Sequence, residues 1–271
     1  MFLLFAAANL PAAGPGEPGG MPPGEKEAKA VLDKSPRHGE WVDITVPGSK
    51  TPLKSYIVYP ERKDKAPVVI VIHEIFGLTD WARSVADQLA ADGFIAIAPD
   101  LLSGHGKDGG GTDSYPTRDD VTKAVRDLKA PEVTAGLNAV RDYAVKLPAA
   151  SGKIATVGFC WGGGQSFAYA AAQPDLDAAV VYYGTPPVPD ALARIKAPVL
   201  GLYGGNDARV TSTVEPTTAE MKKLDKSYTA HVFDGAGHGF LRAQDAQNGA
   251  NQNAADQAWP ETIAFLRDHT K

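Results

Sequence analysis

The sequence has one cysteine, no long apolar run and no excess of positive charge, and each absence excludes a class of protein. A lone Cys160 rules out a disulfide within the chain. The apolar residues 1–8 fall far short of the ~20 that a membrane-spanning helix requires. Lysine and arginine number 27 against 32 aspartates and glutamates, a net charge of −5, and no basic run interrupts this mixture. We therefore expect neither a membrane span nor a nucleic-acid partner.

The histidines, cysteine and carboxylates show no spacing typical of metal ligands, so the sequence predicts no metal site and no cofactor. No internal repeat is visible either. With 271 residues, 44% of them hydrophobic, the chain is long enough for one large α/β domain with a sizeable core. We expect a globular protein that works as a monomer or a small homo-oligomer.

Residues 1–40 differ in composition from the rest of the chain. The apolar start, residues 1–8, leads into the Pro- and Gly-rich stretch 11–24. Two interpretations stay open. Residues 1–13 are the end of a secretory signal that begins upstream, which predicts an exported, periplasmic protein, or they belong to a disordered extension of a cytoplasmic one. Under both, residues 41–271 form a single folded domain.

From residue 41 onward, short apolar runs alternate with amphipathic segments, a pattern typical of a doubly wound α/β sheet. The middle runs are apolar throughout, as in parallel strands covered on both faces, whereas the first two alternate and lie near prolines, which favours antiparallel edge strands. We therefore predict a mostly parallel, twisted sheet of about eight strands with helices on both faces. The predicted strands are 42–46, 53–59, 68–73, 94–98, 154–158, 178–183, 199–203 and 228–233. The predicted helices are 81–92, 131–147, 162–172, 214–224 and 251–270.

The most informative stretch is VGFCWGGG at residues 157–164, which places Cys160 in a Gly-x-Cys-x-Gly turn directly after an apolar run. This is the layout of a nucleophile elbow, a tight strand-to-helix turn in which any neighbour larger than glycine would collide with the backbone. The helix that follows directs its positive end at the sulfur and favours a thiolate. A lone cysteine is more often a small buried hydrophobe. Three consecutive glycines at a helix start carry a propensity cost, however, which favours the catalytic interpretation.

A thiol nucleophile needs a base and a group that orients the base. In open α/β sheets, functional residues gather at the carboxyl ends of the strands. Asp207 follows the predicted strand 199–203, and His238 follows 228–233. The chain order of Cys160, Asp207 and His238 is the order expected of the α/β-hydrolase fold, so we predict that fold and this triad.

Other histidines and carboxylates are weaker candidates. His73 ends a predicted strand and is assigned a supporting role, and Asp100 ends another and is expected to shape a turn. The remaining histidines lie inside a strand, near a terminus, before the domain or in a Gly-rich loop: His231, His269, His38 and His105.

Four motifs, in this order, resemble the dienelactone hydrolase family of the α/β-hydrolases. They are HEIFGL at 73–78, APDL at 98–101, GFCWGG at 158–163 and GHGF at 237–240. The resemblance covers residues 42–265 and implies a carboxylic ester hydrolase that acts on a small ester or lactone. It also implies that Cys160 attacks the carbonyl to form a thioester acyl-enzyme, and that His238, oriented by Asp207, transfers the proton.

The resemblance assigns four further residues. The backbone N–H groups of Ile75 and Trp161 would form the oxyanion hole. Glu74 matches a glutamate that governs thiol ionisation as substrate binds, and Arg242 matches an arginine that pairs with a substrate carboxylate. Physical chemistry favours both assignments, because a buried carboxylate is costly unless its charge is used and a planar guanidinium suits a carboxylate.

The chain departs from the family's pattern after residue 101, where it reads LSGH and lacks the second carboxylate-binding arginine. His105 and Arg118 are the candidates to replace that arginine. The natural substrate therefore stays open between a dienelactone and the broader range of a carboxylesterase or thioesterase. A catalytically silent binding protein on the same fold is a further alternative, which the complete triad disfavours.

Overall fold

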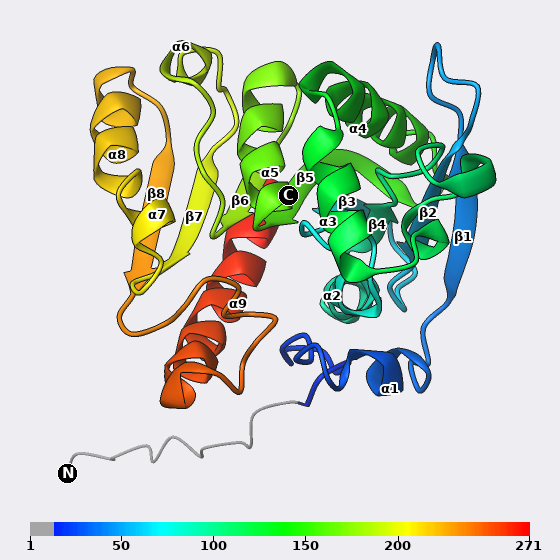
Figure 1. Cartoon of the computed structure of the whole chain (residues 1–271), viewed down its shortest axis with the longest axis horizontal. Coiled ribbons are helices and arrows are strands. Elements are labelled where there is room, and N and C mark those ends of the chain that lie inside the picture. Colours follow the sequence, from blue (N-terminus) through cyan, green and yellow to red (C-terminus); the bar gives the residue numbers. More distant parts are fainter. Residues whose placement is uncertain (1–13) are drawn as a thin grey trace.

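The computed structural model describes residues 14–271. The predicted signal end or extension over residues 1–13 lies outside the described residues. One eight-stranded sheet, in the order β1-β2-β4-β3-β5-β6-β7-β8, is covered by helices on both faces (Figure 1). This arrangement confirms the predicted α/β fold with a mostly parallel sheet.

The sheet combines an antiparallel edge with a parallel body. Its strands are β1 (Gly39–Ile44), β2 (Leu53–Val58), β3 (Ala66–Ile72), β4 (Ile95–Pro99), β5 (Ala150–Phe159), β6 (Ala178–Tyr182), β7 (Val199–Gly204) and β8 (Tyr228–Phe233). Strand β2 runs antiparallel to both β1 and β4, and every other pairing is parallel. The carboxyl ends of β3 to β8 therefore share one edge, where the loops that follow them can bring distant residues together.

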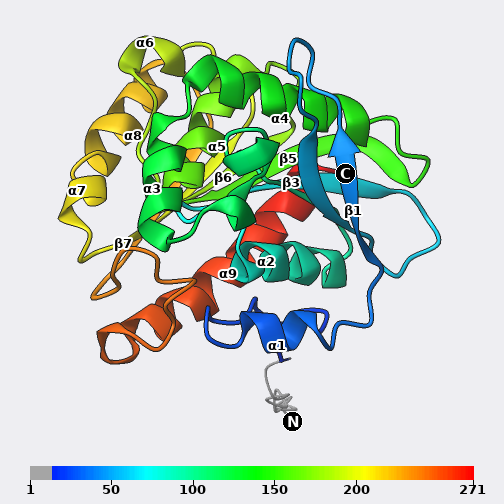
Figure 2. The same cartoon turned by 45° about the vertical axis from the view of Figure 1, so that its right-hand side comes forward.

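Helices form a layer on each face of the sheet, as the turned view in Figure 2 shows. One layer holds α1 (Ala28–Leu32), α2 (Asp80–Ala91) and α9 (Ala250–His269), and the other holds α4 (Ala130–Ala144), α5 (Trp161–Ala172), α6 (Pro189–Leu192) and α8 (Val214–Lys223). The shorter or separate elements are α3 (Arg118–Asp127), α7 (Ala208–Thr211) and the 3₁₀ turns η1 (Lys107–Gly109), η2 (Thr112–Ser114) and η3 (Gln247–Gly249). No helix within residues 14–271 combines the length and the apolar character that crossing a membrane demands.

Strand β3 shows why the middle strands are apolar throughout. Val69 belongs to the core on the α2 and α9 side, Ile70 belongs to the core on the α4 and α5 side, and both are fully buried. Burying each such side chain stabilises the fold by roughly 1.5–3 kcal/mol. Within the sheet, Val69 lies between Ala96 of β4 and Ala155 of β5. Strand β3 is therefore packed by helices on both faces of the sheet and by a neighbouring strand on each side.

Helix α3 is absent from the predicted helices, because only a narrow face of it is apolar. Val121 and Val125 are its buried residues, and they pack with Leu102 in a small cluster separate from the main core. Ile75 and Trp161 pack against the same cluster. The helix therefore covers the loops that follow β3 and β5.

Residues 14–38 lie beside α2 (Figures 1 and 2). They join it through polar contacts and through Ala28, which is buried in the main core. The buried side chains of Asp87, Gln88 and Asp92, on or just after α2, accept hydrogen bonds from this segment. Arg37 pairs with Asp87 at 2.5 Å, and both side chains are buried. Buried polar groups are costly without partners. Residues 14–38 and α2 therefore provide hydrogen-bond partners for each other's polar groups.

Candidate active site

Cys160 stands at the tip of the turn between β5 and α5. Its φ of +56° lies in the left-handed region, which costs a non-glycine residue about 1 kcal/mol or more. A Cβ on Gly158 would lie 1.9 Å from the carbonyl oxygen of Gly162, and a Cβ on Gly162 would lie 2.3 Å from the carbonyl oxygen of Ile72. Close backbone contacts therefore require these glycines, and the turn has the geometry of a nucleophile elbow.

The turn brings Cys160 to two residues far along the chain. Its Sγ lies 3.0 Å from Nε2 of His238, and Nδ1 of His238 lies 2.5 Å from Oδ2 of Asp207. Asp207 is only 9% exposed, so its carboxylate acts on the ring with little screening by water. With Nδ1 donating to that carboxylate, Nε2 is free to accept the thiol proton. The structure thus brings the three predicted triad residues together.

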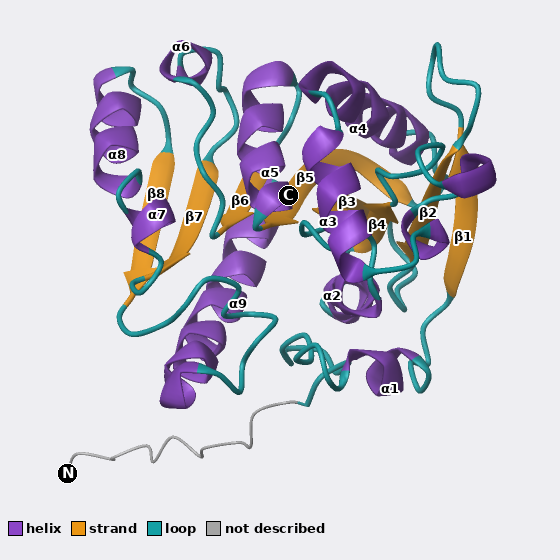
Figure 3. Ribbon diagram, in the orientation of Figure 1, coloured by secondary structure: helices purple, strands orange, loops and turns teal. Residues whose placement is uncertain are grey.

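The loop that carries His238 is the long connection between β8 and α9, teal in Figure 3. The side chain of Asn206, in the loop after β7, donates a hydrogen bond to the carbonyl of Gly235 at 2.9 Å. The N–H of Gly237 donates to the side chain of Asn251 in α9 at 2.8 Å. These bonds attach the loop to its neighbours on two sides and so position the imidazole.

Two opposing effects act on the Cys160 thiol. Burial is the larger and raises the pKa of Cys160, and the charge of Glu74 raises it further. The backbone N–H groups of Trp161 and Ile75 reach the sulfur and lower that pKa without reversing the shift. The free protein therefore holds a thiol, whereas the helix start alone predicts a thiolate. The same two N–H groups converge from separate loops, as the donors of an oxyanion hole do.

His73 and Asp100 hold the loops beside this turn. Nδ1 of His73 lies 2.7 Å from the carbonyl oxygen of Glu74, and its Nε2 accepts a hydrogen bond from the N–H of Leu101 at 3.3 Å. Asp100 accepts hydrogen bonds from the N–H and the hydroxyl of Thr112 at 2.7 and 2.8 Å. Within residues 14–271, no three histidine, cysteine or carboxylate side chains are grouped as ligands for a metal ion. His73 and Asp100 therefore hold the neighbouring loops in position.

Glu74 is buried close to the thiol and pairs with Arg242. Its side chain is 4% exposed, and its Oε2 lies 2.6 Å from Nε of Arg242. Burial raises the pKa of Glu74 to about 7, while Arg242 acts in the opposite direction. A carboxyl group that titrates near neutral pH thus lies where its charge opposes ionisation of Cys160.

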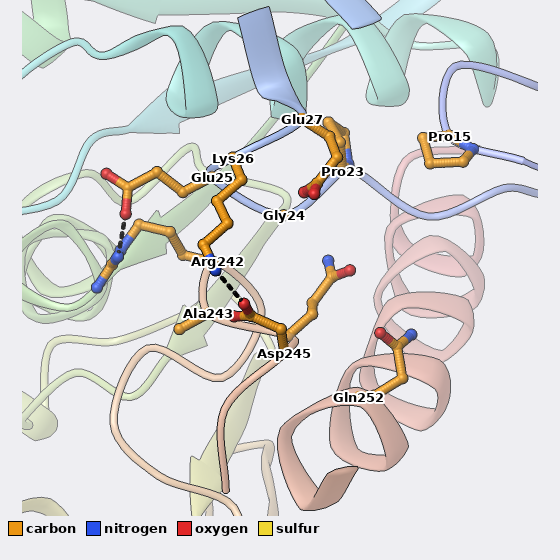
Figure 4. Close-up of a pocket in the computed structure, with 11 residues that line it drawn as sticks. Pro15, Pro23, Gly24, Glu25, Lys26, Glu27, Arg242, Ala243, Asp245 and Gln252 are labelled. Carbon is orange, nitrogen blue, oxygen red and sulfur yellow. Dashed lines mark hydrogen bonds and ion pairs between the residues drawn. The ribbon is translucent and has the colours of Figure 1, made fainter. Parts of the chain in front are cut away.

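Arg242 makes a second ion pair with the N-terminal segment. Its Nη1 lies 2.5 Å from Oε2 of Glu25 (Figure 4). Nη2 of Arg118, at the start of α3, lies 2.9 Å from Oε1 of the same carboxylate. His105, the other candidate for a second arginine's role, pairs instead with Glu132 at 2.5 Å. The structure therefore places Arg118, rather than His105, beside Glu25, the residue that pairs with Arg242.

Sequence reasoning missed two residues of this region. Glu25 directly follows the Pro- and Gly-rich stretch 11–24 and belongs to no motif. Tyr183 directly follows β6, and its ring packs edge-on against His238 with centroids 5.2 Å apart. Its buried hydroxyl has no hydrogen-bond partner among the described residues. Its place at the carboxyl end of a parallel strand was the signal that could have found it.

Known proteins resemble the chain in both sequence and fold. Residues 53–270 match the model of the dienelactone hydrolase family. The chain is 30% identical over 265 residues to a Salmonella typhimurium protein that carries the provisional name carboxymethylenebutenolidase, covering 93% of this chain and 96% of that protein. It is 32% identical over 197 residues to the carboxymethylenebutenolidase of Pseudomonas sp. strain P51, covering 70% and 79%. The crystal structure of a provisionally named dienelactone hydrolase from Klebsiella pneumoniae aligns with a TM-score of 0.73 at 28% identity, covering 85% of this chain and 99% of that one.

Proposed function

Because the chain belongs to the dienelactone hydrolase family and is a hydrolase, we propose that Cys160, His238 and Asp207 carry out its ester hydrolysis. The observation that supports this most is the unbroken line of contacts from Asp207 to His238 and from His238 to Cys160, at 2.5 and 3.0 Å. A strained backbone at Cys160 adds to this support, because core packing by itself gives no reason for such strain.

Acylation begins when Nε2 of His238 takes the thiol proton and the Cys160 sulfur attacks the carbonyl carbon of an ester or lactone. The carbonyl electron pair moves to oxygen, where the N–H groups of Trp161 and Ile75 stabilise the negative charge. Asp207 stabilises the imidazolium formed at the same moment. The intermediate then expels the alkoxide, which takes the proton from His238 and leaves a thioester on the sulfur.

Deacylation repeats these steps with water as the nucleophile. His238 takes a proton from water as the water oxygen attacks the thioester carbonyl, and the same two N–H groups stabilise the oxyanion. The sulfur of Cys160 leaves and recovers its proton from the imidazolium. One water is consumed and one carboxylic acid is released for each ester bond cleaved, which returns the enzyme to its thiol form.

We assign to Glu74 the control of ionisation of the Cys160 thiol. Arg242 is the ion-pair partner of Glu74 in this role. Burial and the charge of Glu74 both raise the pKa of Cys160, which favours a thiol that keeps its proton until His238 removes it during attack on the substrate. A thiol is also less readily oxidised than a thiolate, which protects the enzyme between turnovers.

A broad carboxylesterase or thioesterase is the second candidate function, and one observation favours it over cleavage of a dienelactone. Arg242, the residue matched to a substrate carboxylate, already pairs with Glu74 at 2.6 Å. A substrate carboxylate would therefore meet a guanidinium whose charge is balanced within the protein. Neutral short-chain esters have no carboxylate, so their binding does not require an unpaired guanidinium.

The decisive experiment compares hydrolysis of a dienelactone, short-chain 4-nitrophenyl esters and a thioester by the wild type and by Cys160→Ala. We expect the variant to lose at least about 10⁴-fold in kcat/KM on every substrate that the wild type cleaves. Mass spectrometry of wild type quenched during turnover should find the acyl group on the peptide that contains Cys160. Equal rates for the two proteins would overturn the triad, and a strong preference for the dienelactone over every neutral ester would overturn the broad esterase.

A further inference from the structure

We propose that Glu25 is a specificity-determining residue for this hydrolysis, a proposal that rests on the function given above. Its carboxylate lies between the guanidinium groups of Arg118 and Arg242, at the position that a carboxylate on the substrate would otherwise take. The site therefore discriminates against acyl groups that carry a negative charge and prefers neutral ones.

The two arginines lie beside the reaction centre. Phe76 directly follows Ile75, whose N–H reaches the nucleophilic sulfur. The guanidinium carbon of Arg118 lies 3.6 Å from the centre of the Phe76 ring, and that of Arg242 lies 5.1 Å from it. Arg242 also pairs with Glu74, the residue before Ile75. Both positive charges are thus grouped around the three-residue loop that supplies an oxyanion donor.

Glu25 satisfies both arginines in the way an external carboxylate would. One of its oxygens lies 2.5 Å from Arg242, and the other lies 2.9 Å from Arg118. Such charge-assisted hydrogen bonds are roughly twice as strong as neutral ones. When Glu74 is ionised, the cluster of Glu25, Glu74, Arg118 and Arg242 carries two positive and two negative charges. Glu25 therefore removes the excess positive charge that would attract a substrate anion.

The N-terminal segment holds Glu25 firmly in this place. The N–H of Glu25 donates to the carbonyl of Arg242 at 2.9 Å. Two residues earlier, the carbonyl of Pro23 accepts a hydrogen bond from the indole N–H of the buried Trp81 at 3.1 Å. Figure 4 shows this segment laid beside the loop that carries Arg242. A carboxylate fixed within the molecule has a high effective concentration, so a substrate carboxylate competes with it poorly.

The test uses two esters that differ by one charge. The 4-nitrophenyl monoester of glutaric acid has a free carboxylate, and in the mixed 4-nitrophenyl methyl diester this carboxylate is capped. We expect the wild type to prefer the diester in kcat/KM. Glu25→Gln, which keeps the shape and removes the charge, should raise the ratio of monoester to diester kcat/KM by about tenfold, mainly through a lower KM for the monoester.

A matched control and a second variant separate specificity from a merely structural role. Glu27→Gln removes the same charge from an exposed position of the same segment, and its ratio should stay within about twofold of wild type. Adding Arg118→Gln to Glu25→Gln should reduce the gain, because the monoester then loses one of its two partners. A structural role for Glu25 would change both esters alike and would not depend on Arg118.

The outcomes distinguish this proposal from the one on which it rests. An unchanged ratio in Glu25→Gln overturns the role of Glu25, and the triad stands if Cys160→Ala is still inactive on both esters. Wild-type activity in Cys160→Ala overturns the triad itself. Should Glu25→Gln fail to fold, the wild type decides, since its preference for the monoester would overturn the proposal and its preference for the diester would support it.

Discussion

Two chains of polar side chains meet at the carboxyl edge of the sheet, and they are built in different ways. The first, which we call the triad chain, consists of Asp207, His238 and Cys160 in contacts of 2.5 and 3.0 Å. Each of its members lies in a loop or turn that follows a parallel strand. Such residues can be found by locating the strands and reading what comes after them.

The second, the ion-pair chain, consists of Glu74, Arg242, Glu25 and Arg118. Only Glu74 lies close to the end of a strand. Its partners come from the middle of a long loop, from the N-terminal segment and from the first residue of α3. Glu25 also lies outside residues 53–270, the part of the chain that matches the family.

We therefore expect reactivity and selectivity to depend on different parts of this molecule. Each residue of the triad chain follows a strand of the sheet, so we expect variants that preserve the sheet and these loops to preserve the contacts at 2.5 and 3.0 Å. The ion-pair chain depends on how residues 14–38 pack on α2. We therefore expect changes in the triad chain to remove turnover on all substrates, and changes in the ion-pair chain to alter substrate preference, thiol ionisation or stability.

The strongest test of this division, after removal of the Cys160 thiol, is Asp207→Asn. Its amide can donate to Nδ1 of His238, which leaves the proton on Nε2 and prevents that nitrogen from accepting the thiol proton. We expect kcat to fall by about 10³-fold or more on charged and neutral esters alike. Asp234→Asn, an exposed aspartate in the loop before His238, is the control and should keep wild-type rates. A loss confined to one class of ester would contradict the division.

A smaller effect is expected where the N-terminal segment attaches to α2. Arg37→Met removes the charged partner of Asp87 and leaves a buried carboxylate with only the hydrogen bond from the Ser35 hydroxyl, which should cost about 3–5 kcal/mol of unfolding free energy. Urea unfolding measures this change. Adding Asp87→Leu removes the unpaired charge and should restore most of the loss. If Arg37→Met alone costs less than about 1 kcal/mol, the segment is not attached to α2 by this ion pair.

The smallest expected effect concerns the thiol. Glu74→Gln removes a negative charge that raises the pKa of Cys160, so that pKa should fall while burial still keeps it above its usual range. The measurement is the rate of alkylation by iodoacetamide as a function of pH, and the variant should react faster than wild type at neutral pH. Glu27→Gln serves as the control for net charge. A slower reaction in Glu74→Gln would show that its charge does not oppose ionisation.

The strands and the candidate triad were predictable because their signals are local. Apolar or alternating runs predicted all eight strands. The largest offset at a strand start is in β5, which begins at Ala150 rather than 154 because its first residues are largely polar. The glycines around Cys160 predicted a tight turn, and the backbone contacts at Gly158 and Gly162 supply the reason. Chain order then selected Asp207 and His238 from among the other acids and histidines.

Other features left no such signal. Helix α3 has only a narrow apolar face, around Val121 and Val125, in an otherwise polar segment, and it was not predicted. The position of Arg118 at its first residue was therefore not predicted either. The direction of the Cys160 pKa shift follows from burial, which is a property of the folded molecule. The polar side chains of Asp87 and Gln88 on α2 look like solvent-facing residues until the segment that covers them is in view.

The parallel sheet, the turn at Cys160 and the candidate triad could be predicted from the sequence, because apolar periodicity and glycine turns are encoded within a few neighbouring residues. The contact of Glu25 with Arg242, a residue 217 positions away, became visible only in the folded molecule. Ion pairs between distant segments require no pattern at either end. Which residues pair depends on how whole elements pack against each other. We expect the substrate selectivity of this hydrolase to depend on such ion pairs.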